Sequence, residues 1–189
     1  MPNFTAEDVL RVIKSAKNST AIGPDGLATA GLIKYIGEKG ASYLAKTFNL
    51  CLKTLTIPEI WKTAKIVPIP KPVKQVHHST SYRPITLMSA VIKVLEFLIL
   101  PELQENIQLA DHQHGFRAGG STTTALCEIA VQIAKGLNMK RPNDRSILVA
   151  LELSKAFDLL SHDKLLDDVC NTMLPNQFKL WLLVFMTGR

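Results

Sequence analysis

Apolar residues recur at helical spacing through most of the N-terminal third of the chain. The first stripe consists of Val9, Val12, Ile13 and Ala16. Thr5 precedes this stripe and is followed three residues later by Asp8, which is the spacing of a helix-capping box. Two more helices are predicted near residues 28–36 and 40–55, with glycines between them, and Pro58 ends this helical region.

Between residues 65 and 88 the pattern changes to two short β-type runs. The runs cover residues 65–69 and 84–88, and the loop between them is rich in Lys, His, Ser and Pro. Prolines at positions 68, 70 and 72 cannot donate to a sheet ladder, which favours an exposed edge hairpin over a central strand. Helical spacing then returns and ends near Pro101 or shortly after, with apolar positions Val91, Val94, Leu95 and Leu98.

The C-terminal half combines a long amphipathic helix with one continuous apolar run. Ser121 can cap a helix that extends to about Met139. Its apolar face consists of Leu126, Ile129, Ala130, Ile133, Ala134 and Leu137. Residues 147–151 are short, continuous and apolar, which predicts a central strand over 146–153 that is covered on both faces. The fold class is therefore predicted to be helix-rich α/β (α+β).

Two helices are predicted to complete the chain. Ser161 can cap the first of them. The second starts from Pro175, and its apolar positions are Phe178, Trp181, Leu182 and Phe185.

Composition narrows the class of protein without fixing its partner. The 189 residues are 47% hydrophobic and 20% charged, as in a globular protein, and the net charge of +6 permits a nucleic-acid partner. Three widely spaced cysteines (Cys51, Cys127 and Cys170) indicate buried thiols in a reducing compartment. The N-terminus has no signal-peptide pattern, and no apolar run approaches the ~20 residues that span a bilayer. An intracellular protein, in the cytoplasm or nucleus, is expected.

The candidate chemistry centres on Glu152, an acid where the predicted strand leaves the core. Ligands of open α/β sheets commonly bind at that edge, and a buried carboxylate needs a metal or a basic partner. His112 and His114, like the pair at 77–78, lack a Cys or acidic cluster with metal-ligand spacing and are interpreted as surface residues. The adjacent pair Asp167–Asp168 lies within a helical pattern and is interpreted as a solvated face.

The run from Ala150 to His162 resembles the first catalytic segment of the reverse transcriptases of non-LTR (LINE-type, jockey-like) retrotransposons. Further motifs of that family are matched in the same order. They are Gly23-Pro24-Asp25-Gly26, Trp61, the segment 66–72, Ser81-Tyr82-Arg83-Pro84-Ile85-Thr86-Leu87, Gln113-His114-Gly115-Phe116-Arg117 with Ser121-Thr122, Leu174-Pro175, Trp181 and Gly188-Arg189. The resemblance covers roughly residues 15–189.

The resemblance implies a role for each matching residue. Glu152 stands at the place of the catalytic, metal-binding aspartate, with Leu153 beside it in the metal site. The residues implied to bind the deoxynucleoside triphosphate are Arg83, Lys71, Phe157 and Ala156. Those implied to support the template are Gln113, Gly115, Phe116 and Arg117. The extra methylene of Glu152 moves its carboxylate by roughly 1.5 Å, whereas catalytic constellations tolerate about 0.5 Å.

The resemblance also implies the organisation of a right-hand polymerase. A helical N-terminal region (1–60) would precede the fingers (61–145) and an incomplete palm (146–189), within one truncated reverse transcriptase domain. The sequence contains neither the Pro-Gln-Gly block nor the Tyr-x-Asp-Asp segment that follow in the family. We therefore expect a fragment of an RNA-directed DNA polymerase that is inactive alone. Its intact relative would use Mg²⁺, an RNA template, a DNA primer and deoxynucleoside triphosphates. No membrane partner is expected.

Two alternatives to a polymerase fragment remain open. The chain could act as a non-catalytic nucleic-acid-binding or protein-interaction domain derived from such an element, using its basic fingers on phosphates. It could also be a decayed reading frame without a function, which would express poorly and expose apolar surface.

Overall fold

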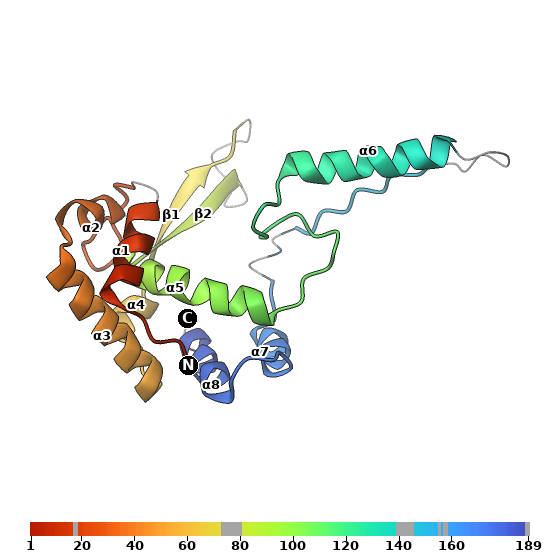
Figure 1. Ribbon diagram of the computed structural model, residues 1–189. Coiled ribbons are helices and arrows are strands. Elements are labelled where there is room, and N and C mark those ends of the chain that lie inside the picture. Colours follow the sequence, from red (N-terminus) through yellow and green to blue (C-terminus); the bar gives the residue numbers. More distant parts are fainter. Residues whose placement is uncertain (17–18, 73–80, 139–145, 155, 157–158, 188–189) are drawn as a thin grey trace. The chain divides into compact units, whose positions relative to one another are not determined.

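The computed structural model describes residues 1–16, 19–72, 81–138, 146–154, 156 and 159–187. The chain forms two compact units, of which unit 1 consists of Met1–Ile107 with His162–Arg189 and unit 2 of Gln108–Ser161. Among the described residues, helices predominate and two strands form a small sheet (Figure 1). This arrangement agrees with the helix-rich α/β class that the sequence predicts.

The first helix of unit 1, α1 (Ala6–Ser15), begins with the predicted capping box. The Asp8 N–H donates to the Thr5 hydroxyl at 3.2 Å, and the Thr5 N–H donates to the Asp8 carboxylate at 3.0 Å. The bond from the Thr5 N–H, followed by one that the Thr5 hydroxyl donates to the same carboxylate at 2.7 Å, holds the pKa of Asp8 below its ordinary value. The helix buries Val9 and Ile13, which confirms the stripe read from the sequence.

Three further helices follow: α2 (Thr29–Tyr35), α3 (Glu38–Thr54) and α4 (Glu59–Lys62). Helix α3 starts two residues before the predicted position because Gly37, rather than Gly40, is its N-cap. It ends at Leu55, which adopts the left-handed conformation that commonly terminates helices. Helix α4 was not predicted, since four residues are too few to show a helical period, yet it places Trp61 in the core.

The two β-type runs form the predicted exposed hairpin. Strand β1 (Ala64–Pro70) pairs antiparallel with β2 (Tyr82–Met88), and most residues of both strands are exposed. Pro68 lies opposite Pro84, so the position without an amide donor is shared by both strands. The hairpin extends away from the helices of unit 1 (Figure 1).

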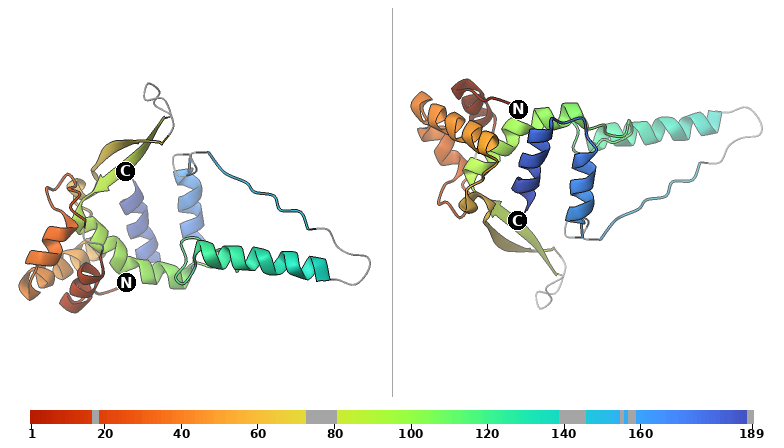
Figure 2. Two further views of the ribbon diagram at one scale, coloured as in Figure 1. Left: turned by 90° about the horizontal axis from the view of Figure 1, so that it is seen from above. Right: turned by 90° about the horizontal axis from the view of Figure 1, so that it is seen from below.

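The hydrophobic core of unit 1 gathers the helices around α5 (Ala90–Asn106), which continues five residues beyond Pro101. Helices α7 (His162–Cys170) and α8 (Asn176–Met186) lie side by side in this unit (Figure 2). The predicted apolar face of α8 is confirmed, with Trp181 fully buried and stacked on a neighbouring ring at a centroid distance of 5.0 Å. The other fully buried large side chains are Phe48, Phe178, Ile13, Leu52, Ile92, Leu95 and Val9.

Unit 2 contains α6 (Thr122–Asn138), the long helix predicted after Ser121, and the segment 146–154. The prediction of a buried strand over 146–153 is wrong, because this segment is neither a strand nor buried in the structure. A strand is held by hydrogen bonds to a neighbour, and no described strand pairs with this segment. Its apolar side chains are therefore exposed, by 85% at Ile147 and 90% at Leu151.

The cysteines lie in two kinds of environment. Cys51 is buried in α3, and this burial raises the pKa of its thiol. Cys127 and Cys170 are exposed, which corrects the expectation that the thiols are buried, because the helix faces that carry them lack a covering element among the described residues. In the described part of the chain, every helix is too short or too polar to cross a bilayer.

Candidate nucleotide and nucleic-acid interface

Two of the predicted nucleotide-binding residues lie at the end of the β1–β2 hairpin where β1 finishes and β2 begins. Arg83 lies on β2 opposite Ile69, and its side chain is exposed. Lys71 follows β1 directly, and its N–H donates to the Ser81 carbonyl at 2.7 Å, which extends the ladder past Tyr82. The backbone register thus places two basic residues near the same end of the hairpin, with Arg83 exposed and Lys71 half-buried. A guanidinium and an ammonium are the side-chain groups that suit phosphate oxygens.

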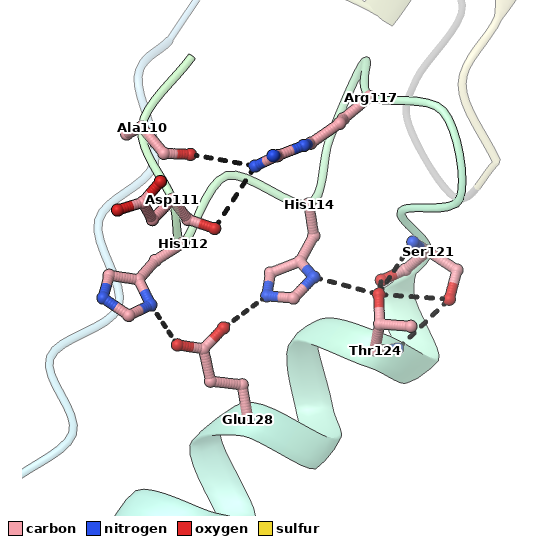
Figure 3. Close-up of polar contacts among 8 residues, drawn as sticks. All are labelled: Ala110, Asp111, His112, His114, Arg117, Ser121, Thr124 and Glu128. Carbon is pink, nitrogen blue, oxygen red and sulfur yellow. Dashed lines mark hydrogen bonds and ion pairs between the residues drawn. The ribbon is translucent and has the colours of Figure 1, made fainter. Parts of the chain in front are cut away.

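The predicted template-binding residues lie within one loop of unit 2. The Gln113 side chain donates to the Gly115 carbonyl at 3.0 Å. The Arg117 guanidinium lies 3.4 Å from each of the carbonyls of Ala110 and Asp111, which are long contacts for hydrogen bonds (Figure 3). These contacts fold the loop back on itself and occupy one edge of the guanidinium.

The tip of this loop presents an aromatic ring to solvent. Phe116 is 85% exposed. Its φ is +60°, a backbone conformation that residues other than Gly, Asn and Asp rarely adopt. Gly119 also has a positive φ, of +78°. A Cβ on Gly120 would lie 2.1 Å from the His114 carbonyl, so the loop closes only with glycine there. The Phe116 ring is thus exposed on a residue whose own backbone conformation is strained.

A cluster of polar side chains fastens the loop to α6, and it was missed by the sequence interpretation. The imidazoles of His112 and His114 both contact the Glu128 carboxylate, at 2.6 Å for His114 Nε2 (Figure 3). The other ring nitrogen of His114 lies 2.9 Å from the Thr124 hydroxyl. The hydrogen bond from His114 is the largest cause of the lowered pKa of Glu128. The signal in the sequence was the polar pair Thr124 and Glu128, which lie four residues apart and therefore on one face of the helix.

This His112–Glu128–His114 clamp lines one end of a groove of about 570 Å³ within unit 2. Residues of α6 and of the following segment form the rest of the groove. Most of them are apolar (Ala125, Ile129, Ile133, Ile147 and Leu148), and Gln132 and Ser146 are polar. A Cβ on Gly136 would lie 2.6 Å from the Ser146 hydroxyl, so the segment after residue 145 starts in close contact with α6. The residues around the groove thus come from three parts of unit 2, namely the loop with His112 and His114, α6, and the segment after residue 145.

The residues predicted for the metal site, Glu152 and Leu153, are exposed in unit 2. Of the other two residues predicted to bind the nucleotide, Ala156 is exposed and Phe157 lies outside the described residues. Within the described ranges, no group of three His, Cys, Asp or Glu side chains could hold a metal ion. The described residues therefore do not fit the two-ion site that nucleotidyl transfer requires, and Glu152 supplies one carboxylate where several are needed.

The sequence-predicted residues thus form three local groups. Arg83 and Lys71 share the hairpin of unit 1. The loop 113–117 and the segment with Glu152 belong to unit 2, where α6 contacts the loop through the clamp and contacts Ser146 through Gly136.

Comparison with known proteins assigns the family. The model of the family "Reverse transcriptase (RNA-dependent DNA polymerase)" matches residues 69–189. The chain is 33% identical over 167 residues to "Probable RNA-directed DNA polymerase from transposon BS" of Drosophila melanogaster, covering 86% of this chain and 18% of that relative. It is 30% identical over 189 residues to "RNA-directed DNA polymerase from mobile element jockey" of Drosophila funebris, covering 98% and 20%.

The chain spans about a fifth of the length of the curated relatives it matches. The matched residues 69–189 include the hairpin, the loop 113–117 and the segment around Glu152. The relatives are polymerases of mobile elements, as their names state. The chain therefore belongs to the reverse transcriptase family, and within it to the LINE-type, non-LTR retrotransposon group.

Proposed function

We propose that this chain is the fingers and first palm segment of an RNA-directed DNA polymerase from a LINE-type retrotransposon. The intact polymerase would add deoxynucleotides to a DNA 3′ end opposite an RNA template. The observation that carries the proposal is the hairpin that presents Arg83 and Lys71 together within the matched residues 69–189. The proposed organisation is a helical region (1–60), fingers (61–145) and a partial palm (146–189).

The hairpin would bind the triphosphate of the incoming nucleotide. A guanidinium forms paired hydrogen bonds with phosphate oxygens, while an ammonium acts as a point charge. Arg83 is exposed, and the register with β1 fixes its position along the hairpin. In this assignment Arg83 orients the triphosphate and Lys71 adds positive charge at the same rim.

The loop 113–117 would support the template strand. The exposed Phe116 ring offers a flat surface on which an unpaired base can stack. Glu128 holds the loop on α6 through both histidines, so it acts as a positioning residue for this surface.

Glu152 would lie at the catalytic position of the palm, with Leu153 and Ala156 beside it and Phe157 under the incoming sugar. Polymerases of this family use divalent metal ions, and Mg²⁺ is the ion proposed here. The described residues do not form a metal site, so Glu152 would contribute one carboxylate ligand and the other ligands would come from elsewhere in the intact polymerase. The sequence also lacks a Tyr-x-Asp-Asp segment, so we expect this chain alone not to polymerise.

Titration with a deoxynucleoside triphosphate tests the assignment of the hairpin. Loss of a charge-assisted bond worth about 1.5–3 kcal/mol should make Arg83→Ala bind the triphosphate about tenfold more weakly or worse. Arg83→Lys should fall between, because a lysine keeps the charge without the planar fork. Arg11→Ala is the matched control, since Arg11 lies on α1 and pairs with Asp8. Equal affinities for all four proteins would contradict the proposal.

Primer extension separates this proposal from its main rival. Mg²⁺-dependent incorporation by the purified chain would refute the expectation that it is inactive alone. One observation favours the rival, a non-catalytic nucleic-acid-binding domain: a glutamate stands where the family has aspartate, and it lies on an exposed segment. Binding of an RNA–DNA duplex without nucleotide, weakened by Arg83→Ala and by salt, would support that rival.

A further inference from the structure

The outward face of α3 carries a regular stripe of basic and aromatic side chains. The stripe consists of Lys39, Tyr43, Lys46, Leu50 and Lys53, at alternating spacings of four and three residues. Residues at these spacings lie on one face of a helix. The three lysines recur every seven residues, or about 10.5 Å along the axis, and the stripe is about 21 Å long.

The rest of the structure fixes which way this stripe faces. The opposite side of α3 is buried in the core of unit 1 through Ala41, Ala45, Phe48 and Leu52, and α3 packs on α1 (Figure 1). All five side chains of the α3 stripe are exposed, including 71% of Tyr43 and 59% of Leu50. Rotation of the helix to hide the stripe would expose the core, so the packing of α3 keeps the stripe on the surface of unit 1.

The α3 stripe carries more positive charge than its surroundings compensate. Glu38, next to Lys39, is the single acidic residue of α3, and the next acidic residue in the sequence is Glu59. Among the described residues, no carboxylate forms an ion pair with its three lysines. The Lys46 ammonium lies 5.9 Å from the centroid of the Tyr43 ring, so a cation and an aromatic face form one unit. A second such pair, Lys34 over Tyr35 at 5.1 Å, ends the preceding helix.

We propose that the α3 stripe binds single-stranded nucleic acid, with its lysines on phosphates and Tyr43 stacked on a base. A row of lysines can neutralise successive phosphates of a strand. Unpaired bases stack on exposed aromatic rings, and a neighbouring cation adds to that attraction. A duplex would offer phosphates but no free base face for Tyr43. A second copy of this chain would meet the stripe with its own excess of positive charge.

This surface is separate from the proposed polymerase residues. It lies outside residues 69–189, which match the reverse transcriptase family, and it precedes the hairpin and the loop 113–117 in the sequence. Its role would be to hold a strand without acting on it. The proposal goes beyond the proposed function, because it requires neither nucleotide nor primer.

Fluorescence anisotropy with short labelled oligouridine and oligothymidine tests the proposal on the whole chain. Each lysine–phosphate contact on a single strand contributes about 0.7 to the log–log salt slope. The triple variant Lys39→Gln, Lys46→Gln and Lys53→Gln should therefore lower the slope by about 2. The matched control, Lys14→Gln, Lys135→Gln and Lys164→Gln, makes the same change in net charge elsewhere and should leave the slope within about 0.7 of the parent value.

Tyr43 supplies the second arm of the test. Tyr43→Ala should weaken oligouridine binding about tenfold, the equivalent of one lost stacked base. Tyr43→Phe keeps the ring and should bind as the parent protein does. Because these side chains are exposed, thermal unfolding of the variants should match that of the parent, which separates lost binding from lost folding.

Three outcomes would overturn the proposal. Equal loss of slope in both triple variants would show a general effect of charge. Unchanged affinity in Tyr43→Ala would remove the stacking partner. Competition by polyglutamate as strong as that by oligouridine would indicate an acidic protein in place of a nucleic acid. Binding of oligouridine and oligothymidine with equal affinity supports the proposal without a 2′-hydroxyl contact, and tighter binding of oligouridine supports it with one.

Discussion

The Asp25 carboxylate accepts a hydrogen bond from the Ser89 hydroxyl across 64 residues of sequence. The same hydroxyl accepts bonds from the N–H groups of Val91 at 3.1 Å and Ile92 at 3.4 Å, so it caps α5. The second oxygen of Asp25 accepts a bond from the Leu27 N–H at 3.1 Å. Asp25 thus joins the turn at residues 23–26 to the helix that forms the centre of the core, and a carboxylate is favourable near a helix N-terminus.

This relationship predicts that Asp25 and Ser89 stabilise unit 1 jointly. Ser89→Ala removes the cap and should lower the free energy of unfolding by about 1 kcal/mol. Asp25→Ala removes an ionised acceptor and should cost about 1.5–3 kcal/mol. In urea denaturation the double variant should lose less than the sum of the two single losses, because each substitution already breaks the shared bond. Strict additivity would contradict the coupling, and Asp25→Asn, which keeps an acceptor oxygen, should lose less than Asp25→Ala.

The glycine that opens the same turn is predicted to be intolerant of a side chain. A Cβ on Gly23 would lie 2.4 Å from the Met88 carbonyl oxygen, and backbone atoms cannot move aside as a flexible side chain can. Gly23→Ala should therefore destabilise the protein by about 1–3 kcal/mol. Gly31→Ala is the control, because no atom lies within 4 Å of its added Cβ and it lies within α2. That change should stabilise by roughly 0.5–1 kcal/mol, and a loss of equal size at both positions in thermal melts would refute the steric argument.

The sequence predicted the local elements of unit 1 because their determinants are local. The capping box at Thr5 and Asp8 and the prolines of the hairpin act within a few residues, so α1 and the β1–β2 pair were both found. The buried strand over 146–153 was not found in the structure, since an apolar run specifies burial only when a neighbouring strand or helix covers it. The same run supports a strand or an exposed segment, depending on that neighbour.

The residues of the candidate site were likewise predicted where their determinants are local and missed where they are not. Arg83 and Lys71 were predicted from motifs, and the register of the hairpin brings them together. The clamp on Glu128 was missed because its partners lie 14 and 16 residues away and meet only when the loop folds back on α6. Periodicity records which face of a helix is apolar, but it holds no information on which loop returns to a polar position on that face.

The clamp predicts an unequal response of Glu128 to the loss of each histidine. The bond from His114 is the largest cause of the lowered pKa, and the bond from His112 contributes less. His114→Ala should therefore raise the pKa of Glu128 more than His112→Ala does. Carboxyl NMR titration of the three proteins measures both shifts, and the reverse order would contradict the geometry.

The same clamp predicts a loss of stability in acid. The pKa of Glu128 is lower in the folded protein than the ordinary value of about 4.3, so the unfolded chain binds more protons as the pH falls. The stabilisation is present above about pH 4.3, and it disappears as the pH falls through the lowered pKa. Glu128→Gln cannot ionise, so its urea midpoint should lack this component of the pH dependence, whereas identical pH profiles for the two proteins would rule it out.

The cysteines are predicted to differ in reactivity. Burial of Cys51 raises the pKa of its thiol and blocks access, and the thiolate is the reactive form. Maleimide labelling of the native protein followed by mass spectrometry should therefore modify Cys127 and Cys170 and leave Cys51 unmodified. All three should react after denaturation. Rapid native labelling of Cys51 would show that α3 does not pack on α1 as described.

The segment 146–154 is predicted to exchange its amide hydrogens at the rate of an unstructured peptide. Its residues form no ladder with a described strand, and Ile147, Val149 and Leu151 expose their side chains, so water reaches the backbone. The amides of α5 provide the internal control, because that helix is at the centre of the core and should exchange slowly. Hydrogen exchange followed by mass spectrometry distinguishes the two segments. Slow exchange over 147–151 would mean that a neighbour covers this run after all, and it would restore the buried strand and with it a sheltered position for Glu152.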